Sequence, residues 1–484
     1  MKRIAIIGGG ISGLAAAYTL EQKRQSGTPI GYVLFESSQR LGGVIRTEQV
    51  DGCVVEGGPD SFLTEKPWAT ELCNRIELSD QLIGSNDSER KTYIFAKGKL
   101  VEMPDGLMFM VPTKIMPTVR SPLFSLRTKI RMAAEWFRPP HQPSEDETVA
   151  EMVKRHYGNE MVELLADPLL SGVYGGEASQ LSARAVLPRF AAMESKHGSL
   201  GRAMLAARKD KDKNKDKNKD EEVTGVQSDL PRPLFTSLRE GMQQMIDALL
   251  ANLDEKSLKK NSPVQSLIWQ HDGWTVCAGY QTDHFDAVII ATPTHEAASL
   301  LEGTDSDLSR ELREIQYSSS VTVALGYGEK VRRALPPGFG FLVPRSAGRR
   351  ILASTFVHNK FPHRAPENRA LIRCFLGGTR DEQILQNSEN EILRIVRDDL
   401  RQILGPALDA EPLFTRVYKW ESAMAQYSVG HLERVQRIES RRQRLPGLAL
   451  AGNGYNGIGI PDCVRSGTEA ASKILAEMGM WSSA

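Results

Sequence analysis

The hydrophobic pattern of the chain begins with a short apolar strand, a glycine-rich turn and an alanine-rich helix. Residues 3–7 form the apolar, β-branched run of a buried parallel strand, and Gly8, Gly10 and Gly13 follow it at GxGxxG spacing. A second apolar run, at residues 32–35, ends at Glu36. This order of strand, glycines, helix, strand and acid predicts a dinucleotide-binding βαβ unit.

The residue types in this unit suit a dinucleotide. Gly8 permits a tight turn, Gly10 lets the backbone approach a pyrophosphate, and Gly13 lets helix and strand pack closely. The helix N-terminus offers free N–H groups to the pyrophosphate, and Glu36 is placed to accept hydrogen bonds from an adenosine ribose. A secretory signal is the alternative for this stretch, but glycines interrupt the apolar run and no convincing cleavage site follows.

Later apolar runs predict a return to this sheet and then a second sheet. The run at residues 285–293 (FDAVIIATP) is typical of a buried strand that ends in a small-residue turn at a nucleotide site. Strands are also predicted at 264–268 and 274–278, after an amphipathic helix that ends at about Leu253. A more antiparallel sheet is predicted from the runs at residues 321–327, 351–356 and 371–376. We expect this second sheet to form a separate lobe that holds substrate.

Two further glycine-rich segments indicate which dinucleotide is bound. Arg40-Leu-Gly-Gly gives a second close backbone approach to a diphosphate, with Arg40 available to neutralise it. Flavoproteins that bury a whole FAD often carry this second clamp, and an ordinary Gly-Gly turn is the alternative. The EGGPD loop at residues 56–60 would let backbone lie against a flavin ring. Lys66, just beyond it, is either a solvated lysine or a substrate contact.

The C-terminal motif repeats the opening geometry. Residues 448–467 read LALAGNGYNGIGIPDCVRSG, a strand, a glycine loop and a helix start with Pro461 near its first turn. A helix N-terminus facing the flavin C2 carbonyl would stabilise the charge that develops near N1 when hydride arrives at N5. The segment therefore predicts a second contact region for the same cofactor.

The middle of the chain carries three less regular segments. Residues 107–138 interleave Met, Phe, Leu and Trp with Lys and Arg, a pattern that favours an interfacial lipid contact or an amphipathic helix with its methionines in a core. DPLLSGVYGG at residues 167–176 breaks helical periodicity and predicts a loop lining a cavity. Residues 208–222 contain no apolar side chain and predict a disordered insertion; their interleaved acids argue against a nucleic-acid tail.

Composition excludes several classes of function. A chain of 484 residues is too long for one ordinary domain, so two or three lobes are expected. The net charge of +1 argues against nucleic acid as a partner. The five cysteines form no CxxC or Cys/His cluster, which suits a reducing compartment and gives no metal site. No stretch approaches ~18 uninterrupted apolar residues, so a membrane surface is expected rather than a membrane span.

The chain resembles the protoporphyrinogen oxidase family, close relatives of the flavin amine oxidases, over nearly its whole length apart from the lysine-rich insertion. The stretches GPDSFL, LLSGVYGG and GIPDC are specific to this family, whereas the glycine-rich opening and DAVIIATP are shared by many flavoproteins. The other stretches that carry the resemblance are SSQRLGG, PTKIMPTVRSPLFSL and WESAMAQYSVGH.

The resemblance implies an FAD-dependent oxidase that removes six electrons from a porphyrinogen in three two-electron steps of heme biosynthesis. Each step passes hydride to non-covalently bound FAD, and molecular oxygen reoxidises the flavin and releases hydrogen peroxide. The implied setting is the cytoplasm, with peripheral association at a membrane. Ferrochelatase and a second copy of the chain are the candidate protein partners, and the oligomeric state stays open.

The resemblance also implies site residues. The Gly172 segment would offer a main-chain carbonyl to the pyrrole N–H groups, Lys66 would contact substrate, and no side chain stands out as a general base. The residues expected to contact FAD are Gly8, Gly10, Ile11, Ser12, Gly13, Glu36, Ser37, Arg40, Gly42, Gly43, Gly57, Gly58, Pro59, Asp60, Val264, Trp420, Gly459, Ile460 and Pro461.

Two departures from the family pattern affect the choice of substrate and the local backbone. Animal and plant members carry Arg where this chain has Asp60, whereas the Gram-positive type has Asp there and a nearby Lys that matches Lys66. This favours coproporphyrinogen III over protoporphyrinogen IX. Ala425 replaces the proline of a Met-Pro-Gln-Tyr motif, which puts backbone stiffness in doubt.

The remaining alternatives are a flavin amine oxidase, for which a tether cysteine or an aromatic cage would be usual, and a non-enzymatic flavin-bearing scaffold. The expected fold class is α/β: a Rossmann-like FAD-binding domain, a mixed-sheet substrate domain and an inserted helical membrane-associating domain. The FAD-binding domain is expected over residues 1–80, 231–295 and 436–484 and the substrate domain over 81–106 and 296–435. The helical domain is expected over 107–207, followed by a disordered insertion at 208–230.

Overall fold

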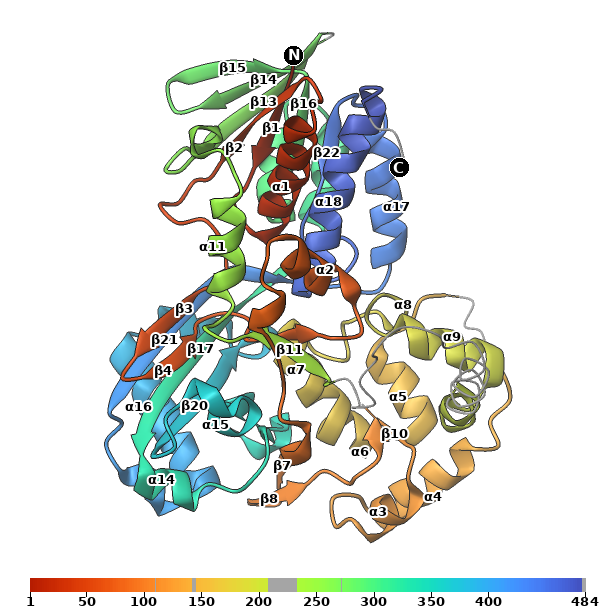
Figure 1. The fold of residues 1–484 in the computed structure, drawn as a ribbon. Helices are drawn as coiled ribbons and strands as arrows, with labels where there is room; N and C mark the ends of the chain where they lie inside the picture. Colours follow the sequence, from red (N-terminus) through yellow and green to blue (C-terminus); the bar gives the residue numbers. More distant parts are fainter. Residues whose placement is uncertain (109, 142–144, 208–232, 271, 481–484) are drawn as a thin grey trace, which may run out of the picture.

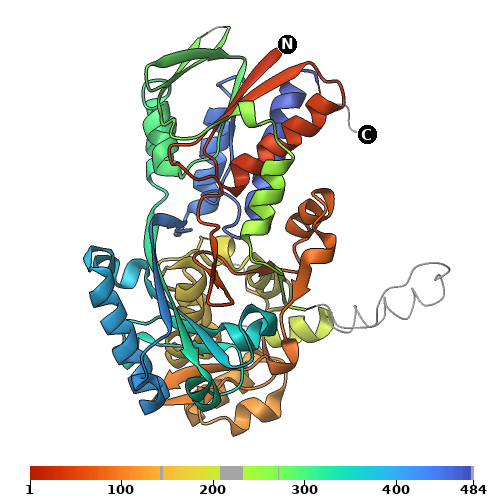
Figure 2. The same cartoon turned by 60° about the vertical axis from the view of Figure 1, so that its left-hand side comes forward.

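The structure is a computed structural model that describes residues 1–108, 110–141, 145–207, 233–270 and 272–480. The chain folds into three lobes, with the first on one side and the other two next to each other beyond it (Figures 1 and 2). The predicted insertion at 208–230 lies outside the described residues.

The first lobe is built on a five-stranded parallel sheet in the order β12-β2-β1-β16-β22. The predicted opening strands are confirmed, because β1 and β2 pair in parallel from Lys2 opposite Ile30 to Ile7 opposite Phe35. The predicted return strand is also confirmed, since β16 pairs in parallel with β1. The strands of this sheet are β1 (Lys2–Ile7), β2 (Ile30–Phe35), β12 (Leu258–Lys259), β16 (Ala287–Ile290) and β22 (Leu448–Leu450).

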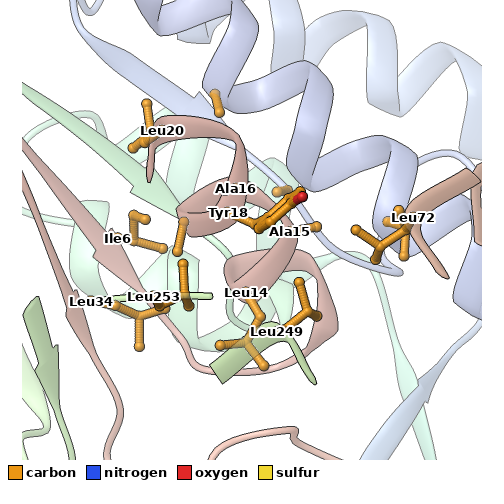
Figure 3. Packing of buried hydrophobic residues seen from close by; sticks show 14 of the residues in the cluster. Ile6, Leu14, Ala15, Ala16, Tyr18, Leu20, Leu34, Leu72, Leu249 and Leu253 are labelled. Carbon is orange, nitrogen blue, oxygen red and sulfur yellow. The ribbon is translucent and has the colours of Figure 1, made fainter. Parts of the chain in front are cut away.

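Helices α1 (Ile11–Gln25), α11 (Gln243–Ala251) and α18 (Ile460–Glu477) cover one face of the sheet (Figure 1). Figure 3 shows this core, in which Ile6 and Leu34 of the sheet lie near Leu14 of α1 and Leu249 of α11. Small residues let α1 and α18 pack closely, because a Cβ at Gly467 would lie 2.0 Å from the Ser12 carbonyl oxygen. The start of α1 therefore lies against the N-terminal half of α18.

The other face of the first lobe carries the antiparallel sheet β13-β14-β15 and three helices. Buried side chains of α12, α13 and α17 join Phe35 and Trp274 in one hydrophobic cluster. The elements are β13 (Val264–Gln270), β14 (Gly273–Ala278), β15 (Gln281–Phe285), α12 (Thr294–Leu301), α13 (Ser306–Arg313) and α17 (His431–Arg442).

The second lobe is a seven-stranded mixed sheet in the order β21-β17-β20-β19-β18-β7-β8. Its pairs are antiparallel except for β18 with β7, which confirms the predicted second sheet. Helix α16 (Glu389–Leu404) begins with a capping box made by Ser388 and Glu391 and packs on the sheet. The strands are β7 (Thr92–Ala96), β8 (Lys99–Glu102), β17 (Tyr317–Gly328), β18 (Gly340–Leu342), β19 (Ala353–Phe356), β20 (Arg369–Gly377) and β21 (Phe414–Ala425), with helices α14 (Glu329–Ala334) and α15 (Val357–Lys360).

Short strands and one helix connect the lobes. The hairpin of β3 (Thr47–Val50) and β4 (Cys53–Glu56) follows the second glycine loop, residues 40–43. A small sheet pairs β11 with β5 and β6. These elements are β5 (Phe62–Leu63), β6 (Leu82–Gly84), β11 (Phe235–Leu238) and α2 (Pro67–Arg75).

The third lobe is helical and contains α3–α9. The single amphipathic helix considered for residues 107–138 is in fact two short helices, because residues 121–125 include Pro122 and a new N-cap at Ser125. The elements are β9 (Leu107–Met108), β10 (Val111–Pro112), α3 (Ile115–Arg120), α4 (Leu126–Glu135), α5 (Val149–Tyr157), α6 (Asn159–Met161), a π-helical turn (Val162–Ala166), α7 (Asp167–Tyr174), α8 (Ala183–Val186) and α9 (Pro188–His197). No helix among the described residues is long and apolar enough to cross a membrane.

The prediction of a loop at residues 167–176 is wrong, because Asp167–Tyr174 forms helix α7. The preceding π-helical turn accommodates Pro168, which would otherwise disrupt a continuous helix. The glycines act at the helix end instead: Gly175 adopts the left-handed conformation (φ +61°) that commonly terminates an α-helix. Gly172 therefore lies in the last turn of a helix.

Candidate functional site

The glycines of the first glycine loop, Gly8, Gly10 and Gly13, do not all have the same role in the structure. Gly8 has φ +107°, and a Cβ there would lie 2.7 Å from the Ala291 carbonyl oxygen. A Cβ at Gly13 would lie 1.9 Å from the Gly8 carbonyl oxygen. At Gly10, the N-cap of α1, a Cβ would meet nothing within 4 Å. Gly8 and Gly13 are thus required by packing, whereas Gly10 faces open space.

The second glycine loop lies directly against the first. The Gly42 N–H donates to the Gly9 carbonyl at 2.8 Å, and a Cβ at Gly43 would lie 3.2 Å from the Gly10 Cα. The Arg40 guanidinium donates to the Ile45 carbonyl at 2.7 Å and also to the carbonyl of Gly43. Arg40 therefore orders its own loop, and burial lowers the pKa of its side chain. Its predicted contact with a diphosphate stays a prediction.

Glu36 lies where β2 ends, beside the first glycine loop. Its carboxylate accepts from the Gly9 N–H at 2.7 Å and the Ser38 N–H at 2.8 Å. A carboxylate has about four acceptor positions, so lone pairs remain for ribose hydroxyls. Ser37 is exposed and its hydroxyl lies 3.3 Å from Glu36, while Val264 is half-buried at the irregular start of β13.

The Gly57–Gly58 loop joins the first lobe to the second. The Trp420 indole N–H donates to the Gly57 carbonyl at 2.8 Å, and the Arg373 guanidinium donates to the Gly58 carbonyl at 2.5 Å. A Cβ at Gly58 would lie 1.8 Å from the Val44 carbonyl oxygen, so a larger residue cannot occupy this position without movement. Two strands of the second lobe, β20 and β21, therefore hold this loop.

Asp60, which follows the loop, belongs to a buried cluster of charges. Its carboxylate oxygens each lie 3.1 Å from Lys360 Nζ, and Oδ2 lies 3.2 Å from Arg373. Arg364 pairs with Glu56 at 3.0 Å in the same region, and both side chains are almost fully buried. Burial favours the neutral form of Asp60, but Lys360 and Arg373 outweigh it and hold the pKa well below its ordinary value.

Sequence reasoning did not find Lys360, Arg364 or Arg373. Each of the three is buried, and Lys360 pairs with a residue 300 positions away in the chain. No local pattern distinguishes them from the many exposed basic residues. A cross-lobe ion pair becomes visible only when the two lobes are placed together.

The start of α18 completes the site at its other end. Gly459 is its N-cap, Ile460 and Pro461 open the helix, and Asp462 in the first turn is only 5% exposed. Lys66 Nζ donates to Asp462 Oδ2 at 2.6 Å, and the Lys66 side chain is 36% exposed. Lys66 is also the N-cap residue of α2. The predicted substrate contact of Lys66 is untested by this geometry.

The N-termini of α1 and α18 share one property: neither N-cap has a side-chain hydrogen bond. The first N–H groups of an α-helix have no intrahelical acceptor, so both ends retain donors and a positive dipole end. Ser12 is buried at the crossing of these helices, and Ile11 packs partly against the core. Such ends suit an anionic or electron-rich group of a ligand.

Gly172 lies at the exposed end of α7. The last carbonyls of a helix have no intrahelical donor, and here the Ser171 carbonyl accepts from the Gly175 N–H while the Tyr174 carbonyl accepts from Gln426. Within the described part of the chain, no hydrogen bond to the Gly172 carbonyl is formed. A Cβ at Gly172 would meet only Ala353, at 4.0 Å. The Gly172 carbonyl is therefore available to a ligand.

The chain matches known proteins over nearly its full length. The family model described as flavin containing amine oxidoreductase matches residues 11–475. The chain is 34% identical to coproporphyrinogen III oxidase of Bacillus subtilis, covering 98% of each protein, and 31% identical to that of Staphylococcus aureus, covering 99% and 100%. It is 28% identical to protoporphyrinogen oxidase 2 of Arabidopsis thaliana, covering 98% of this chain and 94% of the relative.

Solved structures show the same architecture. The crystal structure of a protein from Exiguobacterium sp. 255-15 superposes with a TM-score of 0.85 at 29% identity and covers 99% of both chains. Cyclohexylamine oxidase from Brevibacterium oxydans superposes with a TM-score of 0.69 at 16% identity, again over 99% of both chains, and this likeness shows the fold alone.

Proposed function

The chain belongs to the flavin containing amine oxidoreductase family and is an oxidoreductase. From this premise we propose that it is an FAD-dependent oxidase of a porphyrinogen in heme biosynthesis, with molecular oxygen as the electron acceptor. The observation that carries the proposal is the near full-length similarity to coproporphyrinogen III oxidases at 30–34% identity. The glycine loops and uncapped helix ends described above support it.

The residues present fit FAD. Gly10 offers open space beside the uncapped N-terminus of α1, as a pyrophosphate requires, and Glu36 retains acceptor capacity for a ribose. When bound, FAD supplies the acceptor for a hydride removed from the substrate. The N–H groups at the start of α18 would stabilise negative charge at one end of the ring system. The Gly57–Gly58 backbone, held by Trp420 and Arg373, would orient the ring.

We propose that FAD is bound non-covalently. Cys463, in the first turn of α18, is the cysteine nearest to the proposed ring-binding end in sequence. Burial raises the pKa of its thiol to about 12, so it remains protonated and unreactive at neutral pH. Acid precipitation should release all of the yellow chromophore to the supernatant, and colour retained in the pellet would contradict non-covalent binding.

The substrate we favour is coproporphyrinogen III, with protoporphyrinogen IX as the runner-up. The Asp60 and Lys66 pattern supports this choice, as do the names of the three coproporphyrinogen III oxidases. The exposed end of α7 would offer the Gly172 carbonyl to pyrrole N–H groups, and the proposed mechanism needs no named general base. The ratio of kcat/KM for the two porphyrinogens tests the choice, and a clear preference for protoporphyrinogen would reverse it.

We further propose reversible association with a membrane surface through α3 and α4. Large apolar side chains on these helices and just beyond them are exposed, from 49% at Val119 to 74% at Leu126 and 86% at Phe137. Lys114, Arg120 and Arg127 lie among them and are exposed. Apolar surface edged by cations is what an interfacial helix offers to anionic lipid.

Sedimentation with anionic liposomes at low salt tests this surface. Replacement of Lys114, Arg120 and Arg127 with glutamine should reduce the bound fraction. The matched control replaces Lys330 and Arg333, exposed cations of α14 in the second lobe (Figure 1), and should leave binding unchanged. Equal binding by the wild type and the first variant would exclude this surface.

A further inference from the structure

The segment that follows strand β21 contacts all three lobes. Ala425 is fully buried and still pairs with Tyr317 in the β17–β21 ladder, and Gln426 and Tyr427 come next. Ala425 occupies the position of a family proline, so the stiffness of this backbone does not come from a proline ring. Beyond a register shift in the ladder, the pairing of Met424 and Ala425 with β17 keeps the backbone extended up to Gln426, whose N–H donates to the Gln316 carbonyl at 2.9 Å.

Gln426 holds the exposed end of α7. Its side-chain amide donates to the Tyr174 carbonyl at 2.6 Å and to the Ser318 hydroxyl of β17 at 3.0 Å. The Thr379 N–H, just beyond β20, donates to the Gly175 carbonyl at 2.8 Å. The turn that carries the free Gly172 carbonyl is thus fixed to the second lobe, and the buried Gln426 side chain supplies the bond nearest that turn.

Tyr427 holds the loop that precedes α18. Its hydroxyl donates to the Asn453 carbonyl at 2.6 Å and accepts from the Gly457 N–H at 2.7 Å, so it bridges the two ends of the loop. Its ring is 2% exposed and stacks on His431 with centroids 3.9 Å apart and planes 13° apart. His431 in turn bonds the Tyr455 carbonyl at 2.9 Å in the middle of the same loop.

We propose that Gln426 and Tyr427 are positioning residues that set the substrate-contacting carbonyl of Gly172 relative to the flavin-contacting start of α18. This proposal rests on the proposed function. The two residues are consecutive, so their Cα atoms are held about 3.8 Å apart and neither attachment point can move without the other. Gln426 acts through α7 on the porphyrinogen, and Tyr427 acts through residues 453–457 on FAD. Neither side chain takes part in the redox chemistry.

Two conservative variants separate the two roles. Tyr427→Phe keeps the ring and its stack on His431 but leaves the Asn453 carbonyl and the Gly457 N–H without their shared partner. We expect the Kd for FAD to rise about tenfold, because an unsatisfied buried polar group is costly. Gln426→Met keeps the side-chain length but removes the donors to Tyr174 and Ser318. We expect the Kd for coproporphyrin III to rise about tenfold, with the Kd for FAD unchanged.

The measurements are FAD binding to the apoprotein by flavin fluorescence and coproporphyrin III binding to the FAD-loaded protein by porphyrin fluorescence, neither of which requires turnover. Tyr280→Phe and Gln383→Met alter exposed side chains of the same types and should change neither constant. Ser318→Ala removes one acceptor of the Gln426 amide and should shift porphyrin affinity in the same direction by a smaller factor. It replaces Gln426→Met if that variant does not fold.

The crosswise pattern supports the proposal: Tyr427→Phe weakens FAD, and Gln426→Met weakens the porphyrin. The same change in both constants by both variants would show a general loss of structure and overturn it, as would no change in either. A wild-type protein that binds FAD but no porphyrin would refute the proposed function and the role of Gln426 together. The FAD constant of Tyr427→Phe would then still decide the role of Tyr427.

Discussion

Replacing Asp60 with asparagine tests whether the buried charges at the Gly57–Gly58 loop join the first and second lobes. The Asp60 carboxylate lies 3.1 Å from Lys360 and 3.2 Å from Arg373 and is 13% exposed, so solvent screens it little. With Glu56 and Arg364, the cluster holds two carboxylates and three cations, and Asp60→Asn leaves one carboxylate. Removing one partner of a buried ion pair costs roughly 3–5 kcal/mol, and we expect a loss in this range.

The assay is urea denaturation at pH 7, followed by tryptophan fluorescence and by FAD release. Coincident transitions by both probes would justify converting the midpoints to free energies. Asp80→Asn is the control, because Asp80 is exposed and its replacement should change stability by no more than about 0.5 kcal/mol. Lys360→Met should cost less in the Asp60→Asn background than in the wild type, since the two residues share one interaction.

The stability contribution of Asp60 should also depend on pH, in a direction that its lowered pKa determines. The pKa of Asp60 is lowered in the folded protein. Its contribution to the free energy of unfolding is therefore complete above its unfolded pKa of about 3.9 and is lost as the pH falls through its pKa in the folded protein. The difference between wild type and Asp60→Asn should therefore be constant from pH 8 to about pH 5 and shrink below about pH 4. A loss under about 1 kcal/mol at pH 7 would refute the view that this cluster joins the lobes.

Three further predictions concern the helical lobe, Lys66 and the lysine-rich segment. Burial lowers the pKa of His156, but hydrogen bonds to Glu135 (3.1 Å) and Glu194 (2.8 Å) outweigh it and raise the pKa. The contribution of His156 to the free energy of unfolding is therefore complete below its unfolded pKa of about 6.5 and is lost as the pH rises through its pKa in the folded protein. In thermal melts, the Tm of His156→Gln should approach that of the wild type at alkaline pH. A difference in Tm that does not change with pH would contradict this. If Lys66 pairs with a propionate, Lys66→Ala should lower kcat/KM about tenfold for coproporphyrinogen III and by a smaller factor for protoporphyrinogen IX. Losses in kcat/KM near zero for both substrates would show that Lys66 does not contact the substrate. Deletion of residues 209–220 should leave turnover nearly unchanged, and a tenfold loss would show that the segment is functional.

Local sequence signals were sufficient for the parts of the fold that local geometry determines. The pairing of β1 with β2 and the return of β16 were predictable because apolar runs, glycine spacing and a terminal acid act within a few residues of one another. The mixed second sheet was predictable for the same reason, from runs of β-branched residues. The glycines at positions 8 and 13 have the packing roles that the spacing indicates.

The remaining features depend on tertiary placement. Helix α7 was missed because Gly172 and Pro168 weaken a helical pattern, and the π-helical turn that accommodates the proline has no reliable sequence signature. The ion pair of Lys66 with Asp462 joins residues 396 positions apart. Arg40 could be assigned to a diphosphate from its motif, but its bonds to the carbonyls of its own loop are visible only in the structure.

Simultaneous measurement of oxygen uptake and porphyrin fluorescence with the FAD-loaded protein tests the central claim most directly. The protein would be given coproporphyrinogen III and, separately, protoporphyrinogen IX, in air and without oxygen. We predict porphyrin formation only in the presence of oxygen, with three molecules of oxygen consumed per porphyrin formed and a higher kcat/KM for coproporphyrinogen III. Absence of protein-dependent oxygen uptake with both porphyrinogens would contradict the account.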